Sequence, residues 1–251
     1  MEIKFVIPRN DDQIFESHLY NSLKKIGCQA IQIANDSSIK SITHKYNLAV
    51  NILRNATISE DELVVFSHED VSIIDAQFFD KITYLFNSRP DVGIVGIVGS
   101  EKISMDGWWL DTRNNPKGRI LQRNIKRNIK RGMGTLIEFS NVGFYDNVVS
   151  VDNCFFVVRG TLLNRINFDI TNMINDNHFY CNDLCFQSLL NKYKVVVADI
   201  LIYHHSTEHF EISNEWTESQ KIFVEKYKDM KFPITINSFD LNTPEIIEVK
   251  L

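Results

Sequence analysis

Three polar side chains follow a hydrocarbon run in the segment 63-LVVFSHEDVSII-74. A histidine, a glutamate and an aspartate stand side by side there, as His68, Glu69 and Asp70. Imidazole nitrogens and carboxylate oxygens bind divalent cations, and such cations bind phosphate oxygens in turn. A sharp turn at the edge of a sheet would use the same residue types. The segment alone therefore allows two interpretations, a turn or a metal and phosphate site.

Polar residues also end two earlier strands that the sequence predicts. Pro8 and Arg9 close the apolar run 3–8, and Asp36 closes the run 29–36. Further strands are predicted over 62–67 and 92–99, with helices over 12–27, 39–55 and 75–88 between them. This alternation predicts an α/β fold with a mainly parallel sheet, helices on both faces and ligand chemistry at the carboxyl ends of the strands. A turn or a helix cap remains the alternative for Asp36.

The second half of the chain has a different pattern. Helical periodicity fades over 104–146, and basic residues concentrate over 113–131. That basic stretch is either a solvated surface or a site of attraction for an anionic substrate or membrane surface. The apolar run 148–160 is interrupted by Asp152 and Asn153, which indicates a bulge or a site residue.

The remaining polar candidates lie around a helix and a strand near the carboxyl end. A helix is expected over 176–193 with Asp183 in its first turn, where the helix dipole favours an anion. The next predicted strand, 194–205, ends in His204 and His205. An amphipathic helix is expected over 213–230, and the tail 231–251 has no assigned element.

Composition narrows the classes of protein. A chain of 251 residues with 44% hydrophobic content suits one domain with one core, which we expect over 1–230. The net charge of −5 disfavours a general nucleic-acid binder. The four cysteines form no CxxC pair and are too few for a disulfide scaffold, so we expect a reducing cytoplasm, at most beside the inner membrane surface. No segment approaches the roughly 18 consecutive apolar residues of a membrane span.

Several motifs in order resemble those of the family 2 type glycosyltransferases with the GT-A fold. They are HEDV at 68–71, paired tryptophans at 108–109, VDNCFFVVR at 151–159, HFYCNDLC at 178–185 and YHHS at 203–206. A bacterial subgroup of that family has the pattern H-x-D-V, W, V-D-G-x-x-x-x-R, F-H-x-Y-D-x-D-x-C and H-x-S. The resemblance covers roughly residues 1 to 230, and the order and spacing carry it rather than any one motif.

The resemblance implies an enzyme that moves a sugar from a nucleotide-diphosphate donor to a hydroxyl acceptor. The acceptor would be a glycan or a lipid-linked molecule. It implies a divalent cation, Mn²⁺ or Mg²⁺, and residues 1–100 as the nucleotide-binding half, with 101–230 as the acceptor and catalytic half. The implied metal ligands are Asp70 and His204. The implied donor contacts are Pro8, Arg9, Asp36, Tyr46, His68, Glu69 and Asp70, and the implied acceptor-side residues are Trp108, Trp109, Asp152, His178 and His205.

The chain departs from the subgroup at three positions. His68 stands where the leading acid of a DxD motif is usual, and Asn153 replaces a glycine. Cys181 occupies the position of the usual catalytic base. Either Asp183 takes over as the base, or Asp176 does, or catalysis is lost. Two alternatives to an inverting transferase therefore stay open: a relative that binds nucleotide sugar or glycan without catalysis, and an unrelated anion-binding α/β protein whose basic segment grips nucleic acid.

Overall fold

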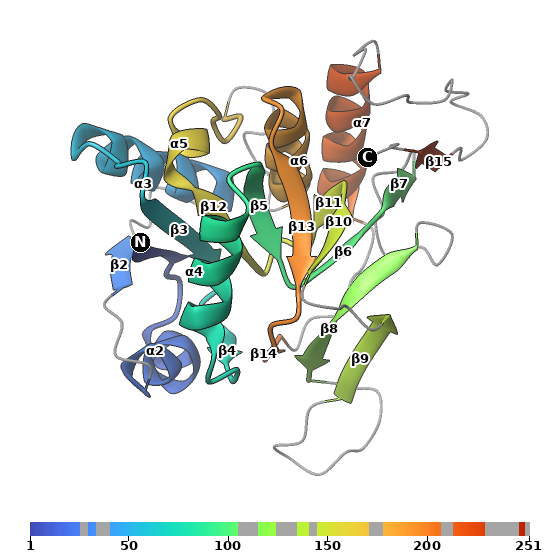
Figure 1. The fold of residues 1–251 in the computed structure, drawn as a ribbon. Helices are drawn as coiled ribbons and strands as arrows, with labels where there is room; N and C mark the ends of the chain where they lie inside the picture. Colours follow the sequence, from blue (N-terminus) through green and yellow to red (C-terminus); the bar gives the residue numbers. More distant parts are fainter. Residues whose placement is uncertain are drawn as a thin grey trace.

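A seven-stranded mixed sheet forms the centre of the fold (Figure 1). The computed structural model describes residues 1–25, 30–33, 41–104, 115–123, 135–140, 145–170, 178–206, 213–228 and 246–248. The strand order is β10-β13-β5-β12-β3-β1-β2. In chain order these strands are β1 (Glu2–Pro8), β2 (Ala30–Ile33), β3 (Glu62–Ser67), β5 (Val92–Gly96), β10 (Tyr145–Val148), β12 (Phe155–Arg159) and β13 (Lys194–Ala198).

The direction of β12 makes the sheet mixed. β1 runs parallel to β2 and β3, and β13 runs parallel to β5, as the alternation of strands and helices predicts. β12 instead inserts antiparallel between β3 and β5. The α/β class is therefore confirmed, while the central sheet is mixed rather than mainly parallel. The reason is that the second half of the chain adds strands inside the sheet as well as at its edge.

Helices cover both faces of this sheet. They are α1 (Asp12–Phe15), a π-helical turn η1 (Glu16–Tyr20), α2 (Asn21–Lys25), α3 (Ile42–Asn55), α4 (Phe78–Ser88), α5 (Gly160–Leu163), α6 (Tyr180–Leu190) and α7 (Asn214–Tyr227). Alternate β3 residues serve the two faces: Val64 and Phe66 pack with α3, α5, α6 and α7, whereas Leu63 and Val65 pack with α1, α2 and α4. Because β3 is buried along its whole length, its end is a fixed platform for the residues that follow.

A second sheet contains the strands next to Asp70 and His204. Its order is β11-β6-β8-β14-β4, and β9 (Thr135–Ser140) pairs with β8. The members are β4 (Val71–Ile73), β6 (Val98–Ser100), β8 (Pro116–Gln122), β11 (Ser150–Val151) and β14 (Ile202–His204). β4 and β14 are antiparallel, with His204 opposite Val71. This pairing places the end of β14 beside the residue that precedes β4.

Three predicted strands prove to be broken. The run 92–99 divides into β5 and β6, the run 148–160 into β10, β11 and β12, and the run 194–205 into β13 and β14. At the first break a Cβ on Gly96 would lie 2.4 Å from Cβ of Val151, so only glycine permits this close approach of β11. The breaks let one stretch of chain contribute to both sheets.

Two further features concern the tail and the helices. β15 (Ile246–Glu248) pairs antiparallel with β7 (Lys102–Ser104), so part of the unassigned tail 231–251 returns to the fold. Among the described residues, none of the helices has the length and apolar content needed to cross a membrane.

Candidate functional site

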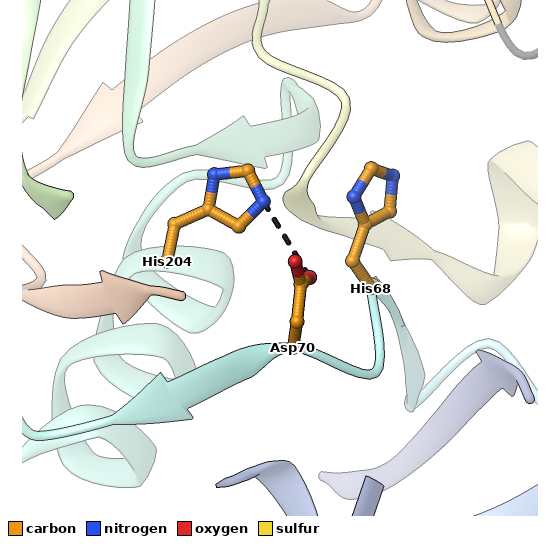
Figure 2. A group of neighbouring side chains, drawn as sticks. All are labelled: His68, Asp70 and His204. Carbon is orange, nitrogen blue, oxygen red and sulfur yellow. Dashed lines mark ion pairs between the residues drawn. The ribbon is translucent and has the colours of Figure 1, made fainter. Parts of the chain in front are cut away.

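His68, Asp70 and His204 converge from three elements; we name them the strand-end cluster. His68 follows β3, Asp70 precedes β4 and His204 ends β14. One ligand atom from each residue lies within 4.8 Å of the others, and Nε2 of His204 is 3.5 Å from Oδ1 of Asp70. Figure 2 shows the two imidazoles on either side of the Asp70 carboxylate. All three side chains are partly buried.

Backbone hydrogen bonds fix these three positions. The His68 N–H donates to the Cys154 carbonyl at 2.9 Å, which extends the pairing of β3 with β12. The His205 N–H donates to the Asp70 carbonyl at 2.8 Å, which extends the pairing of β14 with β4. The cluster is therefore held by sheet hydrogen bonds rather than by a free loop, and this rigidity suits a site that must hold a ligand in one geometry.

The surroundings of His68 keep its imidazole neutral. Burial, together with the nearby His204, lowers the pKa of His68 to about 4. The Tyr180 hydroxyl lies 3.1 Å from Nε2 of His68 and donates its proton to the Asn153 carbonyl at 3.1 Å. Because that hydroxyl donates to the carbonyl, the contact fits the tautomer of neutral His68 that has its proton on Nε2 and an unprotonated Nδ1. This is the pattern of a histidine ligand oriented by a second hydrogen bond.

Asp70 and His204 stabilise each other as a charged pair. Burial favours the neutral acid, but the hydrogen bond and charge of His204 outweigh it and lower the pKa of Asp70. Burial also lowers the pKa of His204, but the hydrogen bond and charge of Asp70 exceed that effect and raise it. A metal ion would replace the proton that the pair shares, since ligating histidine must be neutral.

The donor set fits a divalent transition metal. Two imidazoles and one carboxylate can supply three ligands and leave further coordination positions for a substrate. Imidazole nitrogens suit transition metals, whereas Mg²⁺ prefers oxygen ligands. The cluster therefore suits Mn²⁺ better than Mg²⁺ within the pair of cations expected from the sequence.

Glu69 points away from the cluster and toward the turn after β1. Its carboxylate accepts hydrogen bonds from the backbone N–H groups of Asn10, at 2.7 Å, and Asp11, at 3.1 Å. The ammonium of Lys45, which is only 2% exposed, donates to the side chain of Asn10. Burial raises the pKa of Glu69 and lowers that of Lys45. Glu69 thus joins the first strand end to the third.

His205 lies in a ring stack beside the cluster. Its ring stacks on His18 at 3.7 Å and on Tyr203 at 3.9 Å between centroids, and its Nε2 is 2.9 Å from the Ser72 hydroxyl. Burial, with the nearby His18, lowers the pKa of His205 to about 4. The stack braces β14 against β4 and η1, so the structure gives His205 a bracing contact, and its expected acceptor contact stays a prediction.

The turn at 152–154 is joined to the strand-end cluster, because the Cys154 carbonyl accepts the His68 N–H. Oδ1 of Asp152 accepts a hydrogen bond from the Cys154 N–H at 2.8 Å, and the carboxylate is partly exposed. The charge of Asp152 acts on both His68 and His204. This placement of Asp152 is compatible with the prediction that it is a site residue.

Two residues at the start of α6 occupy different surroundings. Cys181 is fully buried, its thiol contacts the Asp152 carbonyl at 3.7 Å, and burial raises its pKa well above the ordinary value. The Asp183 carboxylate is also fully buried and accepts hydrogen bonds from Lys226, Tyr227 and Gln187, each at 2.6 Å. Burial raises the pKa of Asp183, and Lys226 offsets this only in part. As a base, Asp183 would have to take a proton while these three donors bind its carboxylate.

The other predicted contacts to the donor lie either at the end of β1 or in the hydrophobic core. Pro8 ends β1, and Arg9 forms an ion pair with Asp12 at 2.6 Å and lies over the Phe15 ring. Tyr46 does not fit a nucleotide contact in this structure, because it is 0% exposed. Its ring packs in the core against aromatic neighbours that include Phe66, at 5.0 Å, and Tyr180, at 5.6 Å.

Several predicted residues have little or no structural description. His178 is partly exposed, and its carbonyl accepts from the Tyr180 N–H at 2.7 Å. Asp36, Trp108, Trp109 and Asp176 lie outside the described residues, as does most of the basic stretch 113–131. Within the part described, Lys117 pairs with Glu101 at 3.1 Å and Arg119 with Asp199 at 2.7 Å.

Three residues that contact the candidate site were not predicted from the sequence. Tyr180, Lys45 and His18 make the contacts described above with His68, Asn10 and His205. Tyr180 lies inside the HFYCNDLC motif, so that motif could have indicated it. Lys45 and His18 sit among the polar residues of amphipathic helices, where a solvent-facing position is the ordinary expectation.

The chain matches the model of a family described as glycosyltransferase like family over residues 4–227. The match covers most of the chain, which therefore belongs to this family. No protein with a curated description matches it.

Two solved structures are similar in fold. The structure of GalNAc-T7 with UDP, GalNAc and Mn²⁺ aligns with a TM-score of 0.57 at 8% identity, over 91% of this chain. Because only 48% of the GalNAc-T7 chain is covered, the present chain spans about half of its length. A197 from STIV aligns at a TM-score of 0.48 and 15% identity, over 85% of this chain and 99% of that one. The expected GT-A fold is confirmed by the likeness to GalNAc-T7.

Proposed function

We propose that this protein is a metal-dependent glycosyltransferase that moves a sugar from a nucleotide-diphosphate donor to a hydroxyl group, with inversion at the anomeric carbon. The observation that carries the proposal is the convergence of His68, Asp70 and His204 at the ends of strands in a GT-A fold. Membership of the glycosyltransferase-like family supports the same reaction class.

The proposed reaction requires the site to stabilise negative charge on the leaving group. Breaking a bond between a sugar and a diphosphate leaves negative charge on the departing oxygen. His68, Asp70 and His204 would hold a divalent cation, which supplies positive charge to that leaving group when bound. The pKa of His68, lowered to about 4, keeps this ligand free of a competing proton at neutral pH.

The first strand end offers a place for the rest of the donor. Glu69 holds the backbone of Asn10 and Asp11 beside the cluster, and Lys45 lies behind Asn10. This fixes the β1–α1 turn against the residue next to Asp70. We assign the nucleotide to this edge, and UDP is the first nucleotide to examine because the similar GalNAc-T7 structure contains UDP with Mn²⁺.

The direct test is donor turnover by the purified chain. UDP release from a panel of UDP-hexoses and UDP-N-acetylhexosamines would be measured with Mn²⁺, with Mg²⁺ and with EDTA. We expect release that is fastest with Mn²⁺ and abolished by EDTA. Release that is indifferent to EDTA would remove the metal from the proposal.

A binding module is the second candidate function. The neutral thiol of Cys181 at the usual base position, and the fully engaged carboxylate of Asp183, favour it. A module of this kind would bind UDP in the presence of Mn²⁺ and release no sugar from any donor. Calorimetric binding of UDP measured beside turnover separates the two candidates.

A further inference from the structure

An inverting transfer requires a group that accepts the proton of the attacking hydroxyl, and this need rests on the proposed function. Such a base must be a carboxylate, an imidazole or a similar group that remains available to the acceptor. The strand-end cluster has carboxylates around it, and their hydrogen bonds distinguish them.

Three carboxylates in this region already have other partners. Asp70 forms a pair with His204 at the candidate metal site. Glu69 accepts the N–H groups of Asn10 and Asp11. Asp183 is surrounded by its donors on α6 and α7 and has no exposed surface. Protonating a carboxylate weakens the hydrogen bonds and ion pairs that it accepts, and this loss is costly where the carboxylate is buried.

Asp152 differs from these three in its contacts, because within the described part of the chain its carboxylate is hydrogen-bonded by Cys154 of its own turn. Oδ1 of Asp152 accepts the Cys154 N–H in a short turn, the Cys154 thiol also bonds to this carboxylate, and the side chain is partly exposed. The turn joins β11 to β12 opposite the end of β3, where the Cys154 carbonyl also receives the His68 N–H. The Asp152 carboxylate therefore lies on the turn that is bonded to His68, and among the described residues it forms no ion pair.

We propose that Asp152 is the general base of the transfer. Its carboxylate takes the proton as the acceptor O–H bond breaks, and the acceptor oxygen forms a bond to the anomeric carbon. In the same displacement the bond from that carbon to the diphosphate oxygen breaks, and the electron pair leaves with the nucleoside diphosphate. Asp152 then gives its proton to water, so the products are a glycoside, a nucleoside diphosphate and one proton.

The start of α6 positions the turn that carries Asp152. The Cys181 thiol contacts the carbonyl of Asp152, and the Tyr180 hydroxyl donates to the carbonyl of Asn153. Tyr180 also contacts His68, so one side chain connects this turn to the candidate metal site. A cysteine at position 181 thus supports the turn as a neutral donor, while the base lies on the turn itself.

The test compares two substitutions of Asp152 with a surface control. Asp152→Asn keeps an oxygen that can accept the Cys154 N–H but cannot accept a proton, and Asp152→Ala leaves space for added formate. Asp80→Asn on the exposed side of α4 removes the same charge far from the turn in sequence. UDP release from UDP-sugars, the anomer of the sugar released into water and the Kd for UDP with Mn²⁺ would be measured for each chain.

We expect inversion in the parent chain, a loss in kcat of roughly 100-fold or more for Asp152→Asn, an unchanged Kd for UDP, and partial recovery of Asp152→Ala by formate. Asp80→Asn should match the parent. A fall of kcat by less than threefold in Asp152→Asn, or a retained anomer, would overturn the base while leaving glycosyl transfer intact. Absence of turnover in the parent chain with every donor would overturn the proposed function itself, and the base with it.

Discussion

Two polar clusters of this molecule each have a carboxylate at their centre, partly buried in one and fully buried in the other, and the partners of the two carboxylates differ. The strand-end cluster has Asp70 between two imidazoles, with its shortest contact to them, to Nε2 of His204, at 3.5 Å. The second, which we name the helix-junction cluster, has Asp183 between α6 and α7. It consists of Asp183, Gln187, Lys226, Tyr227 and Asp169.

The difference lies in how completely each carboxylate is hydrogen-bonded. Asp183 has three side-chain donors at 2.6 Å, which satisfy it and fasten α7 to α6. Asp70 lies among loosely spaced groups that are metal ligands by type. A carboxylate with a full set of close donors stabilises the fold, whereas one beside two histidines at ligand spacing can bind an ion.

The largest expected effect comes from Asp70→Asn. This substitution keeps the shape of the side chain and removes the only carboxylate of the strand-end cluster. Since a bound cation contributes several kcal/mol to stabilising the leaving group, turnover should fall by about 1000-fold. The measurement is UDP release at saturating Mn²⁺. Turnover within tenfold of the parent would break the distinction drawn between the two clusters.

Removing the carboxylate of the helix-junction cluster should act on stability instead. Asp183→Ala leaves Lys226 and Tyr227 without their buried partner, which costs about 3 kcal/mol of unfolding free energy. Urea unfolding measures this loss, with Lys226→Met as the matched variant that removes the other half of the ion pair. We expect Asp183→Ala to keep its affinity for Mn²⁺; a loss of that affinity without a loss of stability would make Asp183 a site residue after all.

The sequence predicts the α/β class and the position of the cluster because strand periodicity is local. The buried run that ends at Ser67, and the run that ends at His204, each deliver polar residues at a strand end. β4 follows β3 after three residues and pairs with β14 in the second sheet, so His68, Asp70 and His204 approach one another. The antiparallel entry of β12 could not be predicted, because strand direction depends on pairing between distant segments.

The surroundings of individual side chains were less predictable. Tyr46 belongs to an amphipathic helix, and nothing in the helical spacing shows that its ring packs against Phe66 in the core. Asp183 is an acid in a first helical turn, yet its partners come from α7, some forty residues further along the chain. Such contacts are set by tertiary packing, so residue type and spacing predict a candidate but not its partners.

A smaller effect is expected at the junction of the first and third strand ends. Glu69→Ala removes the acceptor for the Asn10 and Asp11 N–H groups and loosens the β1–α1 turn. Since a hydrogen bond to a charged group contributes about 1.5 to 3 kcal/mol, we expect the KM for the donor to rise about tenfold. Glu69→Gln retains an oxygen acceptor and should show a smaller rise. An equal loss of Mn²⁺ affinity would place Glu69 in the metal site.

The smallest expected effect is a pH dependence of stability in the protein without metal. The pKa values of His68 and His205 are lowered to about 4, so the unfolded chain takes up protons from about pH 6.5 downward while the folded chain does not. These residues therefore make stability fall as the pH falls from about 6.5 toward 4, whereas the raised pKa of His204 acts in the opposite direction. Urea midpoints at about pH 7 and pH 5 would measure the fall. His205→Gln should reduce it, and an unchanged or steeper fall would contradict the stated role of the ring stack.

Binding of Mn²⁺, measured by calorimetry with and without UDP, tests the central claim most directly. We expect one ion per parent chain, tighter binding when UDP is present, no measurable binding by Asp70→Asn, and parent-like binding by Lys226→Met. Equal affinities in the parent chain and in Asp70→Asn would contradict the assignment of the strand-end cluster as the metal site.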